Sequence, residues 1–325
     1  MAKASFWKGR RVLVTGGAGF IGYALATRLA RLGARVFVLD IKPSLPPFAL
    51  SDQNTRRKIN YLRGSVTSRK VVDEVLKKRI RTIFHLAAEA IVGRANKNPA
   101  RTLHTNILGT WTLLESVRAT RGIEEVVVAS SDKAYGSHEK LPYRESAALQ
   151  GLNPYDCSKS GADLIAQMYA HSFGMPITIA RCGNVYGPGD ANWSRLIPDA
   201  FHSALKGRTL DIRSDGTFKR DYIYIDDIVE AYILLAERTA EKEMVGEAFN
   251  FGDGKPLKVL DVLERISKVE PSLRYRIRNI ARNEIKNQYL DASKARRILG
   301  WQARVGEREG FKRTAAWHSQ YLGKI

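Results

Sequence analysis

A tyrosine and a lysine four residues apart, Tyr155 and Lys159, are the first residues of this sequence that could do chemistry together. On a helix they lie one turn apart and share a face, and Asn153-Pro154 before them is typical of a helix start. An ammonium group near a phenol favours the phenolate, so the pair predicts a tyrosine whose pKa is lowered towards neutral pH and which removes a hydroxyl proton. Taken alone, the spacing fits an exposed helical pair equally well.

Three consecutive polar residues, Ser131, Asp132 and Lys133, follow a β-branched run at 125–129. Open α/β sheets bind ligands at the carboxyl ends of their strands, so Ser131 is expected to donate a hydrogen bond to the reacting oxygen. Asp132 in its protonated form could protonate a departing hydroxyl group, and a neutral Lys133 could remove a proton from carbon. The alternative is a surface ion pair of little consequence.

A glycine-rich segment at 15–22 comes directly after the first predicted strand and runs into a predicted helix. Its first glycine permits a tight turn, the second lets the backbone approach a pyrophosphate, and the third lets helix and strand pack closely. The helix amino terminus then faces the phosphate charge. The predicted cofactor-binding residues of this segment are Gly16, Gly19, Phe20, Ile21 and Gly22.

The second predicted strand ends in Asp40, about twenty residues after the glycines. A carboxylate there can accept both ribose hydroxyl groups of NAD and would repel the 2′-phosphate of NADP. NAD is therefore the predicted cofactor. Lys42 is the one nearby residue that weakens the exclusion of NADP.

Short β-branched runs alternate with longer amphipathic stretches through the first half of the chain, a pattern that predicts an α/β fold with a doubly wound parallel sheet. The predicted strands are 11–14, 35–39, 82–86, 125–129 and 177–180. The predicted helices are 21–32, 69–79, 99–120 and 156–173.

After Arg181 the sequence pattern changes and predicts loops with glycine and proline, shorter helices and scattered strands. We therefore predict an NAD-binding Rossmann domain at 1–181 and a smaller, mixed α/β substrate lobe at 182–325. Part of 221–252 is expected to return to the first domain.

Composition is that of a globular protein, since 44% of the 325 residues are hydrophobic. No stretch is long and apolar enough for a membrane helix, and the first residues lack a signal-peptide core, so a cytoplasmic protein is expected. Cys157 and Cys182 have neither a paired framework nor zinc spacing, which predicts two reduced thiols and no metal site.

Charge is the most unusual global property, because 53 Lys and Arg residues against 33 Asp and Glu residues give a formal +20. This favours anionic ligands. The densest basic runs, 77–81 and 274–278, lack the aromatic or glycine patterns of nucleic-acid modules, so no specific nucleic-acid partner is expected. An RNA-associated protein that keeps the fold without catalysis is the alternative, and salt-sensitive RNA binding without turnover would identify it.

The glycine spacing, the segment 85–88 and the Tyr155–Lys159 pair resemble the extended short-chain dehydrogenase/reductase superfamily. In that resemblance Ser65 stands where most relatives carry an aspartate that contacts the adenine, and Asn106 matches a helix asparagine beside the cofactor. The NAD contacts that the resemblance implies, besides the glycine segment and Asp40, are Ser65, Leu86, Ala87, Ala88, Asn106, Tyr155 and Lys159.

Asp132-Lys133 and the segment 195–198 look like the dehydratase branch of the NAD-dependent epimerase/dehydratase family, nearest to CDP-glucose 4,6-dehydratase-like enzymes, whereas 220–227 has the family's general form. The resemblance implies oxidation at C4 of a nucleotide-linked sugar, loss of water across C5 and C6, and return of the hydride to C6. It also implies that 196–198 borders the base pocket. The implied substrate-binding residues are Asn184, Arg195 and Arg220.

Two further expectations follow from the same resemblance. A UDP-sugar 4-epimerase would need only Ser131, Tyr155 and Lys159, and it is the alternative function. The helices at 99–120 and 156–173 commonly pair between subunits in this superfamily, which predicts a homodimer.

Overall fold

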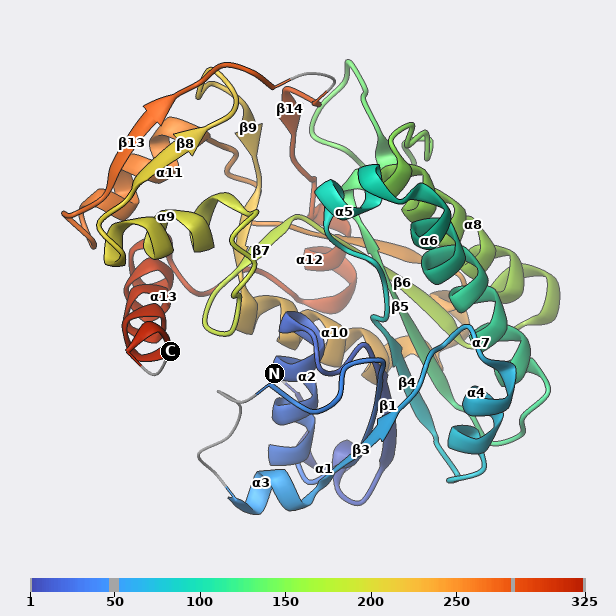
Figure 1. Ribbon diagram of the computed structural model, residues 1–325. Coiled ribbons are helices and arrows are strands. Elements are labelled where there is room, and N and C mark those ends of the chain that lie inside the picture. Colours follow the sequence, from blue (N-terminus) through green and yellow to red (C-terminus); the bar gives the residue numbers. More distant parts are fainter. Residues whose placement is uncertain (1, 47–52, 282–283, 324–325) are drawn as a thin grey trace.

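A seven-stranded parallel sheet forms the centre of the computed structural model, which describes residues 2–46, 53–281 and 284–323 (Figure 1). Its strand order is β11-β6-β5-β4-β1-β2-β3, and every neighbouring pair in it is parallel. The strands are β1 (Arg11–Thr15), β2 (Arg35–Asp40), β3 (Ile59–Arg63), β4 (Thr82–His85), β5 (Glu125–Ser131), β6 (Ile177–Cys182) and β11 (Ala248–Phe251).

Both faces of the sheet are covered, as the nearly continuous apolar strands require. Val12 and Val14 of β1 lie in one core with α2 (Phe20–Arg31) and α10 (Ile225–Thr239). Leu13 lies in the other core, against the opposite layer of helices (Figure 1). That layer comprises α4 (Arg69–Leu76), α7 (Gly109–Arg118) and α8 (Pro154–Phe173).

The predicted α/β class with a doubly wound parallel sheet is confirmed. Two strands of the sheet were not predicted. β3 has only one buried residue among its five, so it lacks the apolar run of a covered strand. β11 comes after the chain has left the sheet and returned, which no local pattern indicates.

The predicted helix at 99–120 is a composite. It consists of α6 (Pro99–Leu103), a π-helical turn (His104–Leu108) and α7. A π-helical turn inserts one residue into the helical repeat and often marks a functional site. Here it carries Asn106.

The chain leaves the main sheet where β6 ends, close to the proposed start of the second lobe, and α10 and β11, both within 221–252, lie on that sheet again. Three small sheets form the lobe's framework, namely β7 (Asn184–Tyr186) with β10 (Tyr222–Tyr224), β8 (Thr209–Ile212) with β13 (Arg274–Ile277), and β9 (Lys219–Arg220) between β12 (Leu257–Lys258) and β14 (Asn287–Gln288). Its helices are α9 (Leu196–Leu205), α11 (Val259–Ser267) and α13 (Glu307–Leu322).

The remaining helices are short: α1 (Ala4–Trp7), α3 (Gln53–Arg57), α5 (Val92–Lys97) and α12 (Ser293–Leu299). Among the described residues, no helix combines the length and apolarity that crossing a membrane requires.

Candidate active site

Tyr155 and Lys159 are both buried on α8, and the helix directs them towards the sheet. The Lys159 Nζ atom donates a hydrogen bond to the Ala129 carbonyl oxygen at 2.8 Å, near the carboxyl end of β5. Further along α8, Asp163 accepts two hydrogen bonds, at 2.9 and 3.0 Å, from the guanidinium of Arg181 on β6. Both groups are buried, so this ion pair fixes the helix against the sheet and holds the tyrosine and lysine in place.

The pKa of Tyr155 differs from the prediction. Burial raises the pKa of its phenol to about 12, and the cation that opposes this increase most is Arg195, not Lys159. The Lys159 ammonium group is itself desolvated and hydrogen-bonded to a carbonyl oxygen, and burial lowers its pKa to about 8, so it still holds its charge at neutral pH. Desolvation of the phenol nevertheless dominates, and the predicted lowering of the Tyr155 pKa is not seen.

Ser131 is the last residue of β5, and a single 3₁₀ turn (Asp132–Tyr135) follows it. The Ser131 hydroxyl donates to Asp132 Oδ1 at 3.0 Å and accepts from the Lys133 amide at 3.2 Å, and Ser131 opposes the increase in the pKa of the Tyr155 phenol. Asp132 Oδ2 is buried and has no hydrogen-bond partner among the described residues. The four side chains thus meet at the carboxyl edge of the sheet.

Asp132 and Lys133 have pKa values displaced towards their neutral forms. Burial raises the pKa of the Asp132 carboxyl group, although Lys133 opposes the increase. Burial also lowers the pKa of the Lys133 ammonium group, with a further contribution from Arg220. A neutral carboxylic acid can donate a proton and a neutral amine can accept one, which the predicted acid/base roles require.

Gln288, which the sequence did not single out, holds the Asp132-Lys133 turn from the second lobe. Its Oε1 accepts a hydrogen bond from Lys133 Nζ, and its Nε2 donates to the Asp132 carbonyl oxygen at 2.9 Å. Gln288 is fully buried on β14, in register with Arg220 on β9. The two residues it contacts lie 155 and 156 positions away, so no local pattern could have indicated it.

Asp156 is a second residue that the predictions omitted. It is buried beside Tyr155, and its carboxyl group accepts a hydrogen bond from Asn153 Nδ2 at 3.0 Å. Burial raises its pKa, while Lys133 and Arg220 lower it. The site therefore contains two carboxyl groups, those of Asp132 and Asp156, and two basic groups, those of Lys133 and Arg220.

The glycine segment forms a tight cradle before α2. Gly16 has a φ of +68°, and a Cβ atom there would lie 2.7 Å from the Ala87 amide nitrogen. A Cβ atom on Gly22 would lie 2.3 Å from the Gly16 carbonyl oxygen. Gly19 is the N-cap of α2 and supplies no side-chain cap, and no acidic residue occupies the first turn of the helix. The amide groups of Phe20 and Ile21 are therefore suited to an anion such as a pyrophosphate, as NAD requires.

Asp40 ends β2 beside this cradle and is largely buried. Its carboxylate accepts hydrogen bonds at 3.0 Å from the amides of Ala18 and Lys42, which leaves lone pairs for a ribose. The Lys42 ammonium group donates to the Ala18 carbonyl oxygen at 2.8 Å. The Lys42 ammonium group thus binds the loop, and among the described residues it forms no ion pair with the Asp40 carboxylate.

The other predicted cofactor contacts fall into two groups. Leu86 and Ala87 donate their amide hydrogens to Thr15, so the loop that also contains Ala88 lies along the glycine cradle. Ser65 follows β3 at the same sheet edge, and its hydroxyl hydrogen-bonds Thr67 at 2.8 Å.

Asn106, another predicted cofactor contact, is hydrogen-bonded within the protein. Its Oδ1 atom accepts from the Glu89 amide at 2.7 Å, and its Nδ2 atom donates to the Glu89 carbonyl and to Ser158 Oγ. Ser158 in turn donates to the Tyr155 carbonyl oxygen at 2.7 Å. Both hydrogens of the buried Asn106 amide and one lone pair of its oxygen are thus used in hydrogen bonds within the protein. Asn106 therefore links the loop after β4 to α8 and is a positioning residue.

Two of the predicted substrate ligands, Arg195 and Arg220, face the catalytic side chains from the second lobe. Arg195 is the N-cap of α9 and pairs with Asp190 at 3.1 Å, and its charge acts on Tyr155. Arg220 on β9 donates three hydrogen bonds to carbonyl oxygens of residues 219, 285 and 286. A guanidinium has five donors, so Arg220 keeps two for a phosphate.

Asn184, the third predicted ligand, lies on β7 and binds the Asp221 carbonyl oxygen through its amide and its Nδ2 atom. Asp221 is fully buried, and burial raises its pKa to about 7. The predicted base-pocket segment 196–198 is mostly core, because Ile197 and Pro198 are buried at the start of α9. Only Leu196 is exposed enough to border a ligand.

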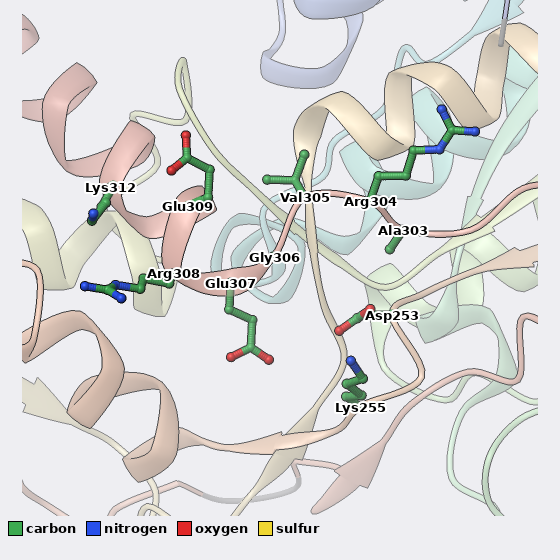
Figure 2. Close-up of a pocket in the computed structure, with 10 residues that line it drawn as sticks. All are labelled: Asp253, Lys255, Ala303, Arg304, Val305, Gly306, Glu307, Arg308, Glu309 and Lys312. Atoms are coloured by element: carbon green, nitrogen blue, oxygen red, sulfur yellow. The ribbon is translucent and has the colours of Figure 1, made fainter.

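A cavity of about 690 Å³ lies between the start of α13 and the segment after β11 (Figure 2). Acidic and basic side chains alternate around it, and none of the predicted site residues lines it. The Asp253 amide in its lining donates to Oδ1 of Asp221 at 2.9 Å, and the carbonyl oxygen of Asp221 in turn binds Asn184. Among the described residues, no cluster of side chains suited to a metal ion is present.

Comparisons with known proteins agree on one family. The model of the NAD dependent epimerase/dehydratase family matches residues 12–252. A trifunctional UDP-glucose 4,6-dehydratase/UDP-4-keto-6-deoxy-D-glucose 3,5-epimerase/UDP-4-keto-L-rhamnose-reductase of Arabidopsis thaliana is 30% identical over 97% of this chain, which spans about half (48%) of that enzyme's length. CDP-glucose 4,6-dehydratase of Salmonella typhimurium is 32% identical, over 99% of this chain and 94% of that enzyme. The crystal structure of UDP-glucose 4-epimerase from Thermotoga maritima with UDP-glucose has a TM-score of 0.87 and 29% identity, covering 96% of this chain and 99% of that one.

Proposed function

This chain belongs to the NAD-dependent epimerase/dehydratase family, and from that premise we propose that it is an NAD-dependent nucleotide-sugar 4,6-dehydratase. One observation carries the choice of dehydratase. A buried acid, Asp132, and a partly buried amine, Lys133, follow the strand that carries Ser131, and desolvation displaces both pKa values towards the neutral forms. Epimerisation at C4 needs no second acid or base, whereas elimination of water needs both.

NAD is the cofactor that the glycine cradle, the bare amino terminus of α2 and Asp40 fit, and when bound it would take up a hydride from the sugar and give it back. Tyr155 removes the proton of the hydroxyl group that is oxidised, with Ser131 donating a hydrogen bond to the same oxygen. Because the pKa of Tyr155 is about 12 in the protein itself, this step depends on nearby cations, of which Arg195 acts most strongly.

The elimination is carried by the second acid/base pair. Lys133 in its neutral form accepts the C5 proton, and protonated Asp132 gives its proton to the C6 hydroxyl group, which leaves as water. Asp132 Oδ2, buried and without a hydrogen-bond partner in the part of the chain that the structure describes, is the atom available to face that hydroxyl group. Arg195 and Arg220 supply the donors that a diphosphate requires.

The test is turnover of a panel of CDP-, UDP-, GDP- and dTDP-linked sugars, with detection of 4-keto-6-deoxy products. Asp132→Asn is expected to lower the rate of product formation by about 10²- to 10⁴-fold, because the amide cannot act as an acid. Tyr155→Phe serves as the control, since it should abolish both elimination and epimerisation. Detection of a C4 epimer that Asp132→Asn still forms at nearly the wild-type rate would show that the dehydratase assignment is wrong.

That outcome would establish the alternative, a UDP-sugar 4-epimerase that uses Ser131, Tyr155 and Lys159 alone. The similarity to the Thermotoga maritima UDP-glucose 4-epimerase favours it over other activities of the family. The substitution separates the two functions because only the dehydratase needs the Asp132 proton.

We also propose that the protein is a homodimer. Neighbouring helices α7 and α8 expose a set of large apolar side chains that a second copy would cover. Trp111, Leu164 and Phe173 are each 53% exposed, and Met168 is 42% exposed. A paired helix face of this kind is what the sequence resemblance implied for 99–120 and 156–173.

A further inference from the structure

A second cavity, of about 900 Å³, lies at the amino edge of the sheet, opposite the edge that carries the candidate active site. It is strongly basic. Six of its twelve lining residues are Lys or Arg, against 53 of 325 in the whole chain, so the cations concentrate here beyond the general basic charge. The lining residues are Ser5, Phe6, Lys8, Gly9, Arg10, Arg11, Arg79, Ile80, Arg81, Arg121, Gly122 and Glu124.

Backbone hydrogen bonds tie the three lining segments side by side. The Arg81 amide donates to the Arg11 carbonyl oxygen at 2.9 Å, and the Glu124 amide donates to the Arg81 carbonyl oxygen at 2.7 Å. The segments precede β1, β4 and β5, which begin at the same edge because the strands are parallel. The basic run at 77–81 thus contributes to one site with cations that are distant in sequence.

Three of the six cations already have partners. Arg10 pairs with Glu124 and Glu125 at 2.5 Å, and Arg81 pairs with Glu124. Arg11 donates to the Lys78 carbonyl oxygen at 2.9 Å, which satisfies an open carbonyl group after α4.

The other three, Lys8, Arg79 and Arg121, are exposed and form no ion pair with any described residue. Glu124 is the only acidic residue in the lining, and it is shared by two arginines. The cavity therefore holds an excess of unpaired positive charge that the proposed sugar chemistry at the opposite edge does not use.

We propose that this cavity is a binding site for a small polyphosphate, meaning a free anion with a chain of three or more phosphate groups. Several cations around one concave site match several linked phosphate charges better than one. The single aromatic lining residue, Phe6, has the Arg10 guanidinium 4.2 Å from its ring centre, so one face is already covered. Single-stranded nucleic acid needs a series of open aromatic faces, which the cavity lacks.

The experiment is calorimetric titration of the full chain with sodium tripolyphosphate, with ATP and inorganic monophosphate in parallel. Both triphosphates are expected to bind and monophosphate is not. A triple variant, Lys8→Ala with Arg79→Gly and Arg121→Ala, should raise the dissociation constant of tripolyphosphate about tenfold or more. Arg79 has a φ of +56°, which glycine adopts freely, so the variant is expected to fold. If it melts early, Lys8→Ala and Arg121→Ala alone should each weaken binding in the same direction.

Two control variants locate the bound anion. Lys97→Ala with Lys140→Ala and Arg297→Ala removes the same charge from exposed residues outside the cavity, and Arg195→Ala with Arg220→Ala removes the predicted diphosphate ligands. Both should keep the dissociation constant within about twofold of the wild type. Three results would each overturn the proposal. The first control variant could weaken tripolyphosphate binding as much as the cavity variant does, the second control variant alone could weaken it, or the wild type could fail to bind tripolyphosphate. A short RNA that binds more tightly than tripolyphosphate and loses its affinity in the cavity variant would also overturn it. Because the readout is binding, failure of the dehydratase assignment leaves this test unaffected.

Discussion

At the scale of single residues, the chemistry of the site depends on burial. Tyr155, Asp132 and Lys133 were each predicted from residue type and spacing, but their protonation states follow from desolvation. Burial raises the pKa of the phenol and of the carboxyl group and lowers that of the amine. Desolvation favours the neutral form of every group, so the same physical cause gives an acid, a base and a poorly ionised tyrosine.

The effect of Lys159 on the free energy of unfolding, measured at two pH values, gives a test of this role of desolvation. Burial lowers its pKa from 10.5 to about 8, so below about pH 8 the folded protein holds an ammonium group at a cost. Between these values the unfolded chain binds more protons than the folded one, and stability rises with pH as this cost disappears. Lys159→Met should therefore increase the free energy of unfolding near pH 7 by up to about 3 kcal/mol, and the gain should shrink towards about pH 10.

Urea unfolding at the two pH values measures this difference. Turnover of the nucleotide sugar should fall by about 100-fold in the same variant, because the cofactor site loses its lysine. Tyr155→Phe is the matched control, as it should lower turnover without a pH-dependent gain in stability. A Lys159→Met protein that is less stable than the wild type at both pH values would contradict the desolvation of Lys159.

At the scale of elements, the turn between β1 and α2 contains one glycine that packing requires and another that ligand binding is expected to require. A Cβ atom on Gly22 would lie 2.3 Å from the Gly16 carbonyl oxygen, whereas one on Gly19 would meet only that oxygen at 3.1 Å. Gly19 also has a φ of −82°, which alanine tolerates. The two glycines were predicted together from one motif, but they have different constraints.

Alanine substitutions should separate those constraints. Gly22→Ala is expected to lower the free energy of unfolding by about 1–3 kcal/mol, because backbone atoms must shift. Gly19→Ala should leave it nearly unchanged but weaken NAD binding about tenfold or more, since the methyl group occupies the approach to the pyrophosphate. Thermal melting and NAD titration of both variants measure the two effects. Equal destabilisation by the two substitutions would show that Gly19 is a packing residue.

At the scale of the whole molecule, the second lobe completes the candidate site through β9 and β14. Gln288 on β14 contacts the Asp132-Lys133 turn, and Arg220 on β9 lies in register with Gln288. The lobe therefore positions the Asp132-Lys133 turn as well as carrying the proposed phosphate ligands.

Substitution of Gln288 tests this coupling. Gln288→Ala should lower kcat about 10- to 100-fold with little change in KM, because Lys133 loses its fixed position. Gln288→Glu should shift the pH dependence of kcat to higher pH, since a carboxylate beside the ammonium group raises the Lys133 pKa. Asn287→Ala, at the exposed neighbouring position of β14, is the control and should behave like the wild type. An unchanged pH profile in Gln288→Glu would refute the positioning role.

The oligomeric state is the second prediction at this scale. Trp111→Glu places a charge in the middle of the exposed face of α7 and α8. Light scattering should give twice the chain mass for the wild type and the chain mass for the variant, because the interface would have to bury an unpaired charge. Phe6→Glu, at a half-buried aromatic residue on α1 and outside α7 and α8, should remain dimeric. A wild-type protein that is monomeric at high concentration would exclude the dimer.

The sequence by itself determined the parallel sheet, the glycine turn before α2, and the placement of Asp40 and of the polar turn after β5 at strand ends, because each depends on neighbours within a few residues or on where a strand ends. It indicated neither β3 nor β11 as strands, since one has a single buried residue and the other returns to the sheet from within the second lobe. Only the tertiary structure decided that Asn106 is engaged by the protein, that Gln288 meets Lys133, and which way each pKa moves. The physical reason is that desolvation and long-range hydrogen bonds depend on which segments pack together, and packing is a property of the folded chain.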